Sequence, residues 1–322
     1  MLKQAARFAL HRLGGLPLLR WRNRNKFAVA VFHSFSEAER PNVEAFCRHI
    51  VRNFEPVSLS TIVQALESGT ALPDNAIHVT VDDGYRNFLL HGHPVFYRHG
   101  IPTTLYAVSG FAAGRSWLWP DLIFYALANS PLTSLQAKLD ANTKLDLNFT
   151  TPAQRTSEAL RLAVALTQVT NPARLAFLSE FGKLCRVEFS ERPPEDRSAM
   201  TWEELRGVAA EKVEIGCHTE THPILSRQLT AAQLEQETQG AKQEMEQRLG
   251  FPVVHFCYPN GQVEDIGSES VRAVRTAGFR SAVTCSQGFN TLGAEPFYIR
   301  RILMDSTLDY QYGVELLSGL HI

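Results

Sequence analysis

The chain has 322 residues, of which 44% are hydrophobic and 20% are charged; this composition can bury a substantial core and excludes a disordered protein. No run of about eighteen apolar residues occurs in the sequence, so no membrane-spanning helix is expected. The five cysteines form no CxxC pair, which argues against a disulfide scaffold or a cysteine zinc knuckle and favours a reducing compartment.

The net charge of −1 conceals an asymmetry along the chain. Residues 1–36 hold seven of the 32 basic residues and no acidic residue, so the remainder has 25 basic against 33 acidic residues. A mildly acidic body argues against nucleic acid as the main partner. Residues 2–13 are typical of a basic amphipathic helix, which either docks weakly on an anionic membrane surface or packs its apolar stripe on the body.

This basic N-terminal segment, residues 1–26, lacks the uncharged apolar core of a signal peptide. We therefore expect a cytoplasmic location. The basic charge of this segment is the reason to consider peripheral association at the inner membrane face. From residue 27 onward, strand-like and helix-like segments alternate. The continuous apolar run FAVAVF at 27–32 is typical of a strand buried on both faces.

The predicted strands cover residues 27–32, 56–59, 77–81, 103–108, 213–217, 253–258, 280–284 and 298–303. The predicted helices cover residues 42–52, 60–67, 85–99, 201–211, 230–249 and 265–277. Ser60 is expected to cap the second helix, capping boxes begin at Thr201 and Thr230, and Gly250 ends the long helix. Between about 111 and 200 helical patterns dominate, which predicts a helical insertion into one domain spanning 27–322.

Repeated β–α units predict an α/β fold with parallel strands covered by helices, either an irregular barrel or an open sheet. Active sites of such folds lie at the carboxyl ends of strands. His33 follows the first strand, Asp82 and Asp83 follow the third, and His218 follows a later one with His222 four residues on. Taken alone, Asp-Asp-Gly is also an ordinary turn signal, and each histidine is equally a hydrogen-bonded loop imidazole.

Taken together, these residues indicate a metal hydrolase. Asp83, His218 and His222 supply three ligands and leave a fourth position for water, the open arrangement of catalytic zinc. Pro223 disfavours a helical backbone at His222, so the pair lies on a loop and is not a helix-borne HExxH site. Asp82 can take a proton as general base. Zn²⁺ is the expected metal, with Co²⁺ or Ni²⁺ as alternatives.

Three motifs in this order resemble those of the polysaccharide deacetylases, the NodB-like carbohydrate esterases. VTVDDGYRN (79–87) resembles the TFDDG motif of the family, HTETHPIL (218–225) its H-S/T-x-x-H motif, and FCYPNG (256–261) its third motif. VFHSFSE (31–37) is similar to the opening of an exopolysaccharide-associated branch. The resemblance covers about residues 27–110 and 201–305. It implies a distorted (β/α) barrel of about seven parallel strands.

The resemblance also implies roles by position. Asp82 is the general base, while Asp83, His218 and His222 bind the metal. The backbone N–H of Asn260, in the Tyr-Pro-Asn-Gly turn, is the expected oxyanion donor, with a plain β-turn as the alternative.

Two departures from the family pattern stand out. Cys257 occupies the place of an arginine that often steadies the base, and Arg300 or Arg301 is the expected substitute. The late Leu-x-His general acid of the family is not recognisable. We take Tyr258 and Arg301 as substrate-binding candidates and His33 as a further catalytic candidate, with a supporting imidazole as the alternative for His33.

The resemblance implies a metal-dependent hydrolase that removes N-acetyl groups from an amino sugar in a polysaccharide or glycolipid, with the insertion forming a lid or groove wall. The two departures keep open a catalytically silent carbohydrate-binding protein. The basic N-terminal segment keeps open an amidase or deformylase acting on a lipid-linked sugar. A carbohydrate is the expected partner in the first two readings, and the oligomeric state is not predicted.

Overall fold

Seven parallel strands close into a barrel in the computed structural model, which describes residues 15–321. The strands are β1 (Ala28–Phe32), β3 (Ala76–Val81), β4 (Thr103–Ala107), β7 (Val213–Cys217), β8 (His255–Cys257), β9 (Ser281–Gln287) and β10 (Ile299–Leu303). They pair in chain order, and β1 closes the ring by pairing with both β10 and β3. The distorted barrel is therefore confirmed, and the open sheet is excluded. The predicted helix at 2–13 lies outside the described residues.

The expected strand at 56–59 is shorter and lies outside the ring. The two-residue strand β2 (Glu55–Pro56) pairs only with the start of β3. The chain turns into α4 (Leu59–Ser68) directly afterwards, and the Oγ of Ser58 accepts a hydrogen bond from the backbone N–H of Thr61 at 3.0 Å. The helix cap is thus Ser58, two residues before the predicted cap Ser60.

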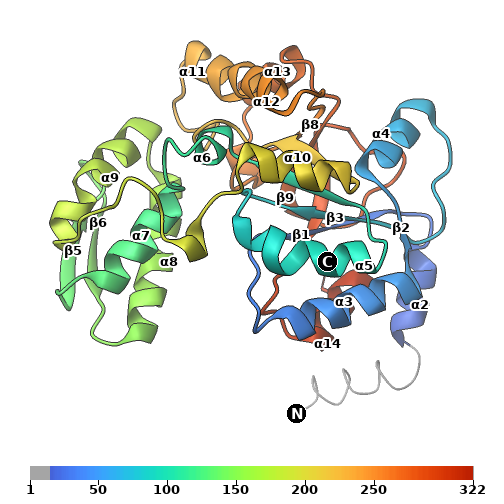
Figure 1. The fold of residues 1–322 in the computed structure, drawn as a ribbon, viewed down its shortest axis with the longest axis horizontal. Helices are drawn as coiled ribbons and strands as arrows, with labels where there is room; N and C mark the ends of the chain where they lie inside the picture. The colour runs from blue at the N-terminus through green and yellow to red at the C-terminus, as the bar shows by residue number, and fades with distance from the viewer. Residues whose placement is uncertain (1–14, 322) are drawn as a thin grey trace.

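Helices surround the barrel on its outer side (Figure 1). They are α2 (Gly15–Asn23), α3 (Arg40–Asn53), α5 (His93–Arg98), α10 (Trp202–Ala210), α11 (Ala231–Glu235), α12 (Ala241–Leu249), α13 (Ser268–Thr276) and α14 (Tyr310–Ser318). A π-helical turn, η1 (Phe88–Gly92), precedes α5, and another, η3 (Gln236–Gly240), joins α11 to α12. The capping boxes at Thr201 and Thr230 and the left-handed C-cap at Gly250 are confirmed. No helix in 15–321 is both long and apolar enough to cross a lipid bilayer.

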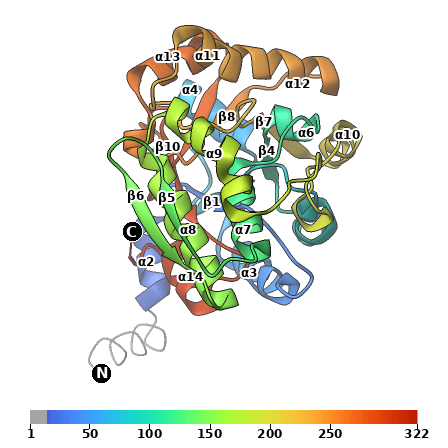
Figure 2. The same ribbon diagram turned by 90° about the vertical axis from the view of Figure 1, so that its left-hand side faces the viewer.

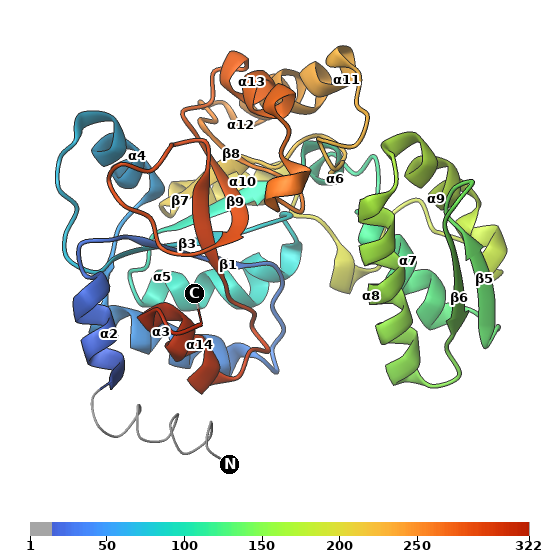
Figure 3. The same ribbon diagram turned by 180° about the vertical axis from the view of Figure 1, so that it is seen from behind.

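The segment between β4 and β7 forms a separate lobe beside the barrel, to the left in Figure 1 and to the right in Figure 3, where the molecule is seen from behind. Its elements are α7 (Trp119–Asn129), β5 (Ser134–Lys138), β6 (Lys144–Asn148), α8 (Pro152–Gln168) and α9 (Asn171–Cys185). They enclose a hydrophobic cluster of their own. The expectation of a wholly helical insertion is wrong in one respect, because β5 and β6 pair as an antiparallel hairpin, visible in Figure 2.

Two short helical turns connect this lobe to the barrel. On the way out, α6 (Ser109–Ala112) follows β4, and on the way back η2 (Glu195–Arg197) precedes α10. The backbone N–H of Arg86 donates to the carbonyl of Ser198 at 2.8 Å, and the N–H of Met200 donates to the carbonyl of Gly84 at 2.9 Å. The returning chain therefore lies against the turn that follows β3.

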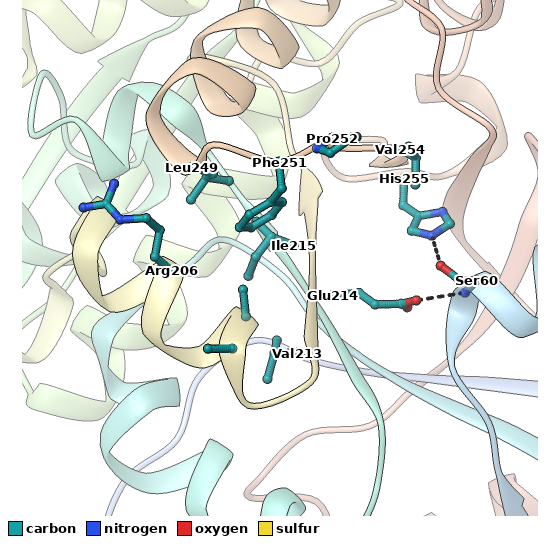
Figure 4. A pocket seen from close by; sticks show the side chains of 12 residues that line it. Ser60, Arg206, Val213, Glu214, Ile215, Leu249, Phe251, Pro252, Val254 and His255 are labelled. Atoms are coloured by element: carbon teal, nitrogen blue, oxygen red, sulfur yellow. Dashed lines mark hydrogen bonds between the residues drawn. The ribbon is translucent and has the colours of Figure 1, made fainter.

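A cavity of about 540 Å³ opens at the amino-terminal ends of the strands, where Val213 begins β7 (Figure 4). The Glu214 carboxylate accepts hydrogen bonds from the backbone N–H groups of Leu59, at 3.0 Å, and Ser60, at 3.1 Å. His255 Nε2 lies 3.2 Å from the hydroxyl of Ser60. These contacts anchor the amino end of α4 beneath the barrel. The predicted site residues lie at the opposite ends of the strands, so this cavity is not the candidate site.

Candidate active site

The three predicted metal ligands converge at the carboxyl ends of β3 and β7. Asp83 Oδ1 lies 3.7 Å from His218 Nε2 and 3.5 Å from His222 Nε2. The ligand atoms of the three residues all lie within 4.8 Å of one another. All three side chains are largely buried, with exposed fractions of 13%, 3% and 12%. The separation of more than 130 residues along the chain is bridged because β3 and β7 both pair with β4.

An uncommon backbone conformation directs Asp83 away from its neighbour. Asp83 has φ +75° and Gly84 has φ +84°, so two successive residues occupy the left-handed region. A Cβ on Gly84 would lie 3.2 Å from the Cβ of Ala107, which leaves little room for a side chain. Strain of this kind in a non-glycine residue gathers at functional sites, where the surrounding structure holds it.

The loop that carries the two histidines is held by a buried acid that the sequence did not reveal. Glu237, in η3, accepts hydrogen bonds from the backbone N–H groups of Glu220 and Thr221, both at 2.9 Å, and from the Thr221 hydroxyl at 2.5 Å. Within the loop, the backbone N–H of His222 donates to Thr219 Oγ1 at 3.0 Å. Thr219 and His222 both have positive φ angles, 70° and 57°. The loop geometry is therefore fixed by polar contacts.

A close approach of α6 holds the other side of this loop. The backbone N–H of Ser109 donates to the carbonyl of Thr219, and that of Gly110 to the carbonyl of Glu220, both at 3.0 Å. A Cβ at position 110 would lie 2.6 Å from the carbonyl oxygen of Glu220, so this position requires glycine. Neither Gly110 nor Glu237 belongs to a motif, and only the fold brings them to the loop.

The chemistry of the donor set fits a divalent cation. His218 Nδ1 lies 2.8 Å from the carbonyl oxygen of Cys257, which fixes the proton on Nδ1 and leaves the Nε2 lone pair facing Asp83. Burial lowers the pKa of His218 to about 4 and that of His222 well below its usual value, so both rings are neutral and able to bind metal. Burial, and then the charge of Asp82, raises the pKa of Asp83 well above its usual value.

A second cluster shares one of these ligands but does not fit a cation. The ligand atoms of Asp82, His218 and Cys257 also lie within 4.8 Å of one another. However, Arg301 Nη2 lies 2.8 Å from Asp82 Oδ2 and 3.3 Å from Cys257 Sγ, so a positive charge already occupies this side. The cation site suggested by the side chains is therefore the one formed by Asp83, His218 and His222.

Asp82 forms a buried bidentate pair with Arg301, which enters the barrel from β10. Nη1 donates to Oδ1 at 2.7 Å and Nη2 to Oδ2 at 2.8 Å, and both side chains are at most 2% exposed. Burial alone would raise the pKa of Asp82, but the Arg301 guanidinium outweighs it and holds this pKa below the usual range. Asp82 is thus ionised and held in one orientation, as a general base requires.

Both predicted substrate contacts need correction. Arg301 is only 1% exposed and points at Asp82, so it positions that carboxylate and does not face open space. Tyr258 is also 1% exposed and packs against Phe256 with ring centroids 5.4 Å apart, so it belongs to the core. The direction of each side chain could not be assigned from its position in the sequence, because residues in and beside a strand point to either face of the barrel wall.

The remaining predicted residues lie at the same end of the barrel. His33 Nε2 is 3.8 Å from Asp82 Oδ2, and its side chain is 38% exposed, so it reaches the base from the solvent side. Asn260 has φ +60°, and its side-chain amide is hydrogen bonded to Asp265. The backbone N–H of Asn260 makes no hydrogen bond with any residue in 15–321. Its role as oxyanion donor stays a prediction.

The lobe contacts the metal-ligand loop directly. The indole N–H of Trp119, at the start of α7, donates to the carbonyl oxygen of His222 at 3.1 Å. Asp121, two residues further along α7, accepts hydrogen bonds from the Tyr85 hydroxyl at 2.7 Å and from Arg197 Nη1 at 2.6 Å. The lobe therefore forms part of the wall around the site.

A closed parallel barrel with an Asp-His-His cluster and an adjacent arginine-paired aspartate at its carboxyl end has the framework of a hydrolase with a candidate metal site. The family model for polysaccharide deacetylase matches residues 188–282, which include both histidines and the 258–261 turn. No curated protein matches the sequence. Residues 188–282 are thus similar to the polysaccharide deacetylase family.

Solved deacetylases share the fold at low sequence identity. Streptococcus pyogenes deacetylase PplD, solved with acetate, is 10% identical with a TM-score of 0.59, over 91% of this chain and 99% of that one. IcaB from Ammonifex degensii is 17% identical with a TM-score of 0.55, over 91% and 97%. The deacetylase domain of BpsB from Bordetella bronchiseptica is 16% identical with a TM-score of 0.53, over 87% and 96%. The family resemblance indicated by the sequence motifs is confirmed.

Proposed function

We propose that the protein is a metal-dependent N-deacetylase that hydrolyses the acetamido group of an N-acetylated amino sugar. The observation that carries this proposal is the meeting of Asp83, His218 and His222 around one point beside an ionised carboxylate, Asp82. Zn²⁺ is the metal proposed, because one carboxylate and two neutral imidazoles suit it best. An exopolysaccharide is the proposed substrate, on the strength of the VFHSFSE opening.

The residues divide the work as follows. A divalent cation held by Asp83, His218 and His222 would polarise the amide carbonyl and activate water for attack. Asp82 accepts the proton of that water, and the guanidinium of Arg301 keeps it ionised and in place until then. His33 Nε2 lies 3.8 Å from Asp82 Oδ2 on the solvent side, so we assign His33 the transfer of that proton from Asp82 to the leaving amine.

One of the two sequence observations that favour a catalytically silent carbohydrate-binding protein no longer does so. That observation is Cys257, which replaces the arginine that steadies the base. Arg301 reaches Asp82 from a different strand and makes the equivalent pair, and it also lies 3.3 Å from Cys257 Sγ. The base is therefore supported although the motif has changed.

Acetate release tests the proposal. The purified protein, loaded separately with Zn²⁺, Co²⁺ or Ni²⁺, is expected to release acetate from at least one N-acetylated glycan among chitin-like, peptidoglycan-like and lipid-linked substrates. Elemental analysis is expected to find one metal per chain. Formate release from an N-formylated analogue, without acetate release from any glycan, would favour the deformylase instead. Glycan binding without any hydrolysis would favour a catalytically silent carbohydrate-binding protein.

We also propose that the N-terminal segment attaches the protein to anionic membrane surfaces. In α2, Leu18 is 64% and Trp21 61% exposed, while Leu16 packs inward. Arg22, Arg24 and Lys26 follow with no acid among them. Exposed apolar side chains beside basic ones are typical of interfacial binding. The cytoplasmic location expected from the sequence stays a prediction.

The double variant Leu18→Ser/Trp21→Ser is expected to lose co-sedimentation with vesicles of phosphatidylcholine and phosphatidylglycerol, while keeping its thermal stability because both side chains are exposed. Pure phosphatidylcholine vesicles are expected to bind the wild type weakly, and added salt to release it. Leu160→Ser, an equally exposed leucine on α8, is the control. Unchanged partitioning of the double variant would contradict membrane attachment.

A further inference from the structure

A cavity of about 480 Å³ lies between the lobe and the barrel, next to the loop that carries the metal ligands. The aromatic and aliphatic part of its wall comes from Trp117, Trp119, Leu122, Leu175 and Leu178. Thr221 and Pro223, which flank His222 on either side, belong to the opposite wall. The cavity is therefore adjacent to the metal-ligand loop, yet none of the proposed catalytic steps uses it.

Arg174, in the first turns of α9, borders this cavity and is only 2% exposed. Its Nη2 donates to Asn171 Oδ1, but its Nε and Nη1 have no hydrogen-bond partner within the described part of the chain. The side-chain Nδ2 of Asn171, also in the cavity wall, is equally without a partner there. Arg174 makes no ion pair with any of the described residues. Three buried donors thus gather at one place without an acceptor.

The nearby acid does not meet this demand. Glu237 borders the cavity and acts electrostatically on Arg174, but its oxygens accept the three hydrogen bonds that hold the Glu220–Thr221 segment of the ligand loop. The guanidinium also lies over the ring of Trp119, 5.0 Å from its centroid, which leaves its edge free. Burial lowers the pKa of Arg174 to about 10, so the side chain is still charged at neutral pH.

An unpaired buried charge is costly, and a protein that retains one normally supplies its partner as a ligand, an ion or water. Guanidinium and amide N–H groups match carboxylate and phosphate oxygens. Arg174 and Asn171 both lie at the amino end of a 15-residue helix, where the helix dipole favours negative charge. Their spacing of three residues places them on one face of that helix.

We propose that this cavity binds an anionic group, a carboxylate or a phosphate, with Arg174 and Asn171 as its donors. Such a group comes either from an acidic or phosphorylated sugar of the substrate or from a free anion. The first source rests on the proposed deacetylase function, whereas anion binding itself does not. Because the cavity borders the loop of His222, an anionic group bound there would be adjacent to the proposed metal site.

Calorimetric titration with inorganic phosphate tests anion binding. The wild type is expected to bind phosphate, and Arg174→Met to weaken that binding at least about 10-fold, since a charge-assisted hydrogen-bond partner is lost. The variant His218→Ala is expected to keep phosphate binding, which separates the cavity from the metal ligands. Arg161→Met, an exposed arginine of the same lobe, is the control for a general loss of charge.

Thermal unfolding provides the second measurement. Without phosphate, Arg174→Met is expected to unfold no lower than the wild type, because an apolar side chain replaces an unpaired buried charge. Phosphate is expected to raise the Tm of the wild type and of Arg161→Met but not that of Arg174→Met. A lowered Tm of Arg174→Met in phosphate-free buffer, with no phosphate effect on the wild type, would make Arg174 a structural residue and overturn the proposal.

Activity distinguishes the two sources. If the substrate carries the anion, the wild type hydrolyses an N-acetylated glycan with a uronate or phosphate group at lower KM than its neutral counterpart, and Arg174→Met removes that difference with kcat kept. If a free anion is bound, phosphate changes the rate on both glycans equally. Phosphate binding that survives Arg174→Met contradicts the cavity proposal while leaving the deacetylase proposal intact. If phosphate binds but no acetate is released from any glycan, only the deacetylase proposal is contradicted.

Discussion

Replacing Asp83 by Asn is expected to abolish both metal binding and acetate release. The variant keeps the size of the side chain but removes its negative charge, and it leaves two neutral imidazoles, His218 and His222, as the only ligands. His218→Ala removes a ligand from the other side and is expected to have the same effect. A loss of about 4 kcal/mol of transition-state stabilisation corresponds to a fall of about 10³-fold in rate.

Metal content measured by elemental analysis and acetate release measured on the same samples check this result. His33→Gln is the informative contrast, because His33 contacts Asp82 and is not a ligand. It is expected to keep the metal while kcat falls by about 10²-fold, the scale of a lost proton transfer. His91→Asn, on a histidine remote from the site, controls for a general effect of histidine removal. Acetate release that survives both ligand variants would show that the mechanism is wrong.

Replacing Arg301 by Met is expected to destabilise the fold by about 3–5 kcal/mol, because it leaves the carboxylate of Asp82 buried without its partner. The same change removes the charge that keeps Asp82 ionised, so activity falls as well. Asp82→Asn is expected to be destabilising for the reciprocal reason, whereas Asp82→Asn/Arg301→Met removes both charges and regains part of the stability. The double variant stays inactive because it has no base.

Denaturant unfolding of the four proteins gives the coupling energy of the pair, and acetate release separates stability from function. Arg300→Met is the matched control, since Arg300 is the exposed neighbour on the same strand. It is expected to behave as the wild type in both measurements. Additive effects of the two single variants would mean that Asp82 and Arg301 are independent, and the assignment of Arg301 as the support of the base would be lost.

The barrel was predictable because its strands are short apolar runs with clear ends. β1 is buried along its whole length, and the predicted 213–217 strand has the same bounds as β7. The hairpin of β5 and β6 was missed although Leu135 and Ala137 alternate with polar residues, as do Leu145 and Leu147. Two apolar residues per strand give too weak a period of two to compete with the helical patterns on both sides.

Element starts were less predictable where the residue expected to begin a helix has hydrogen-bond partners outside that helix. The helix expected from 265 begins at Ser268. The Asp265 carboxylate instead accepts hydrogen bonds from the side-chain amide of Asn260 and from the backbone N–H of Gln262. The helix expected from 85 begins one residue later, at Arg86, and continues into the π-helical turn η1 at Phe88, because the backbone of Tyr85 bridges to Ala199. These partners all lie outside the helices concerned, so the helix propensity of the local sequence does not indicate where each helix begins.

The meeting of Asp83, His218 and His222 could be anticipated because these residues belong to short contiguous motifs, whereas the residues that support them are scattered along the chain. Glu237 looks like any acid on a helix until the fold places it under the ligand loop. The sequence limited the residue that supports Asp82 to Arg300 or Arg301. Choosing between them requires knowing which face of β10 lines the barrel interior. Sequence patterns thus identify groups that react, and tertiary packing decides which groups orient them.

One continuous stretch of the chain between β4 and β7 forms the lobe, whereas every proposed metal ligand belongs to the barrel. Its elements have their own hydrophobic cluster, and its link to the catalytic loop includes a single indole N–H, that of Trp119. Under the proposed function, substrate selection and hydrolysis therefore belong to two parts of the fold that can diverge separately. An exchanged cassette that preserves the Trp119 contact could redirect the same hydrolytic centre to a different glycan.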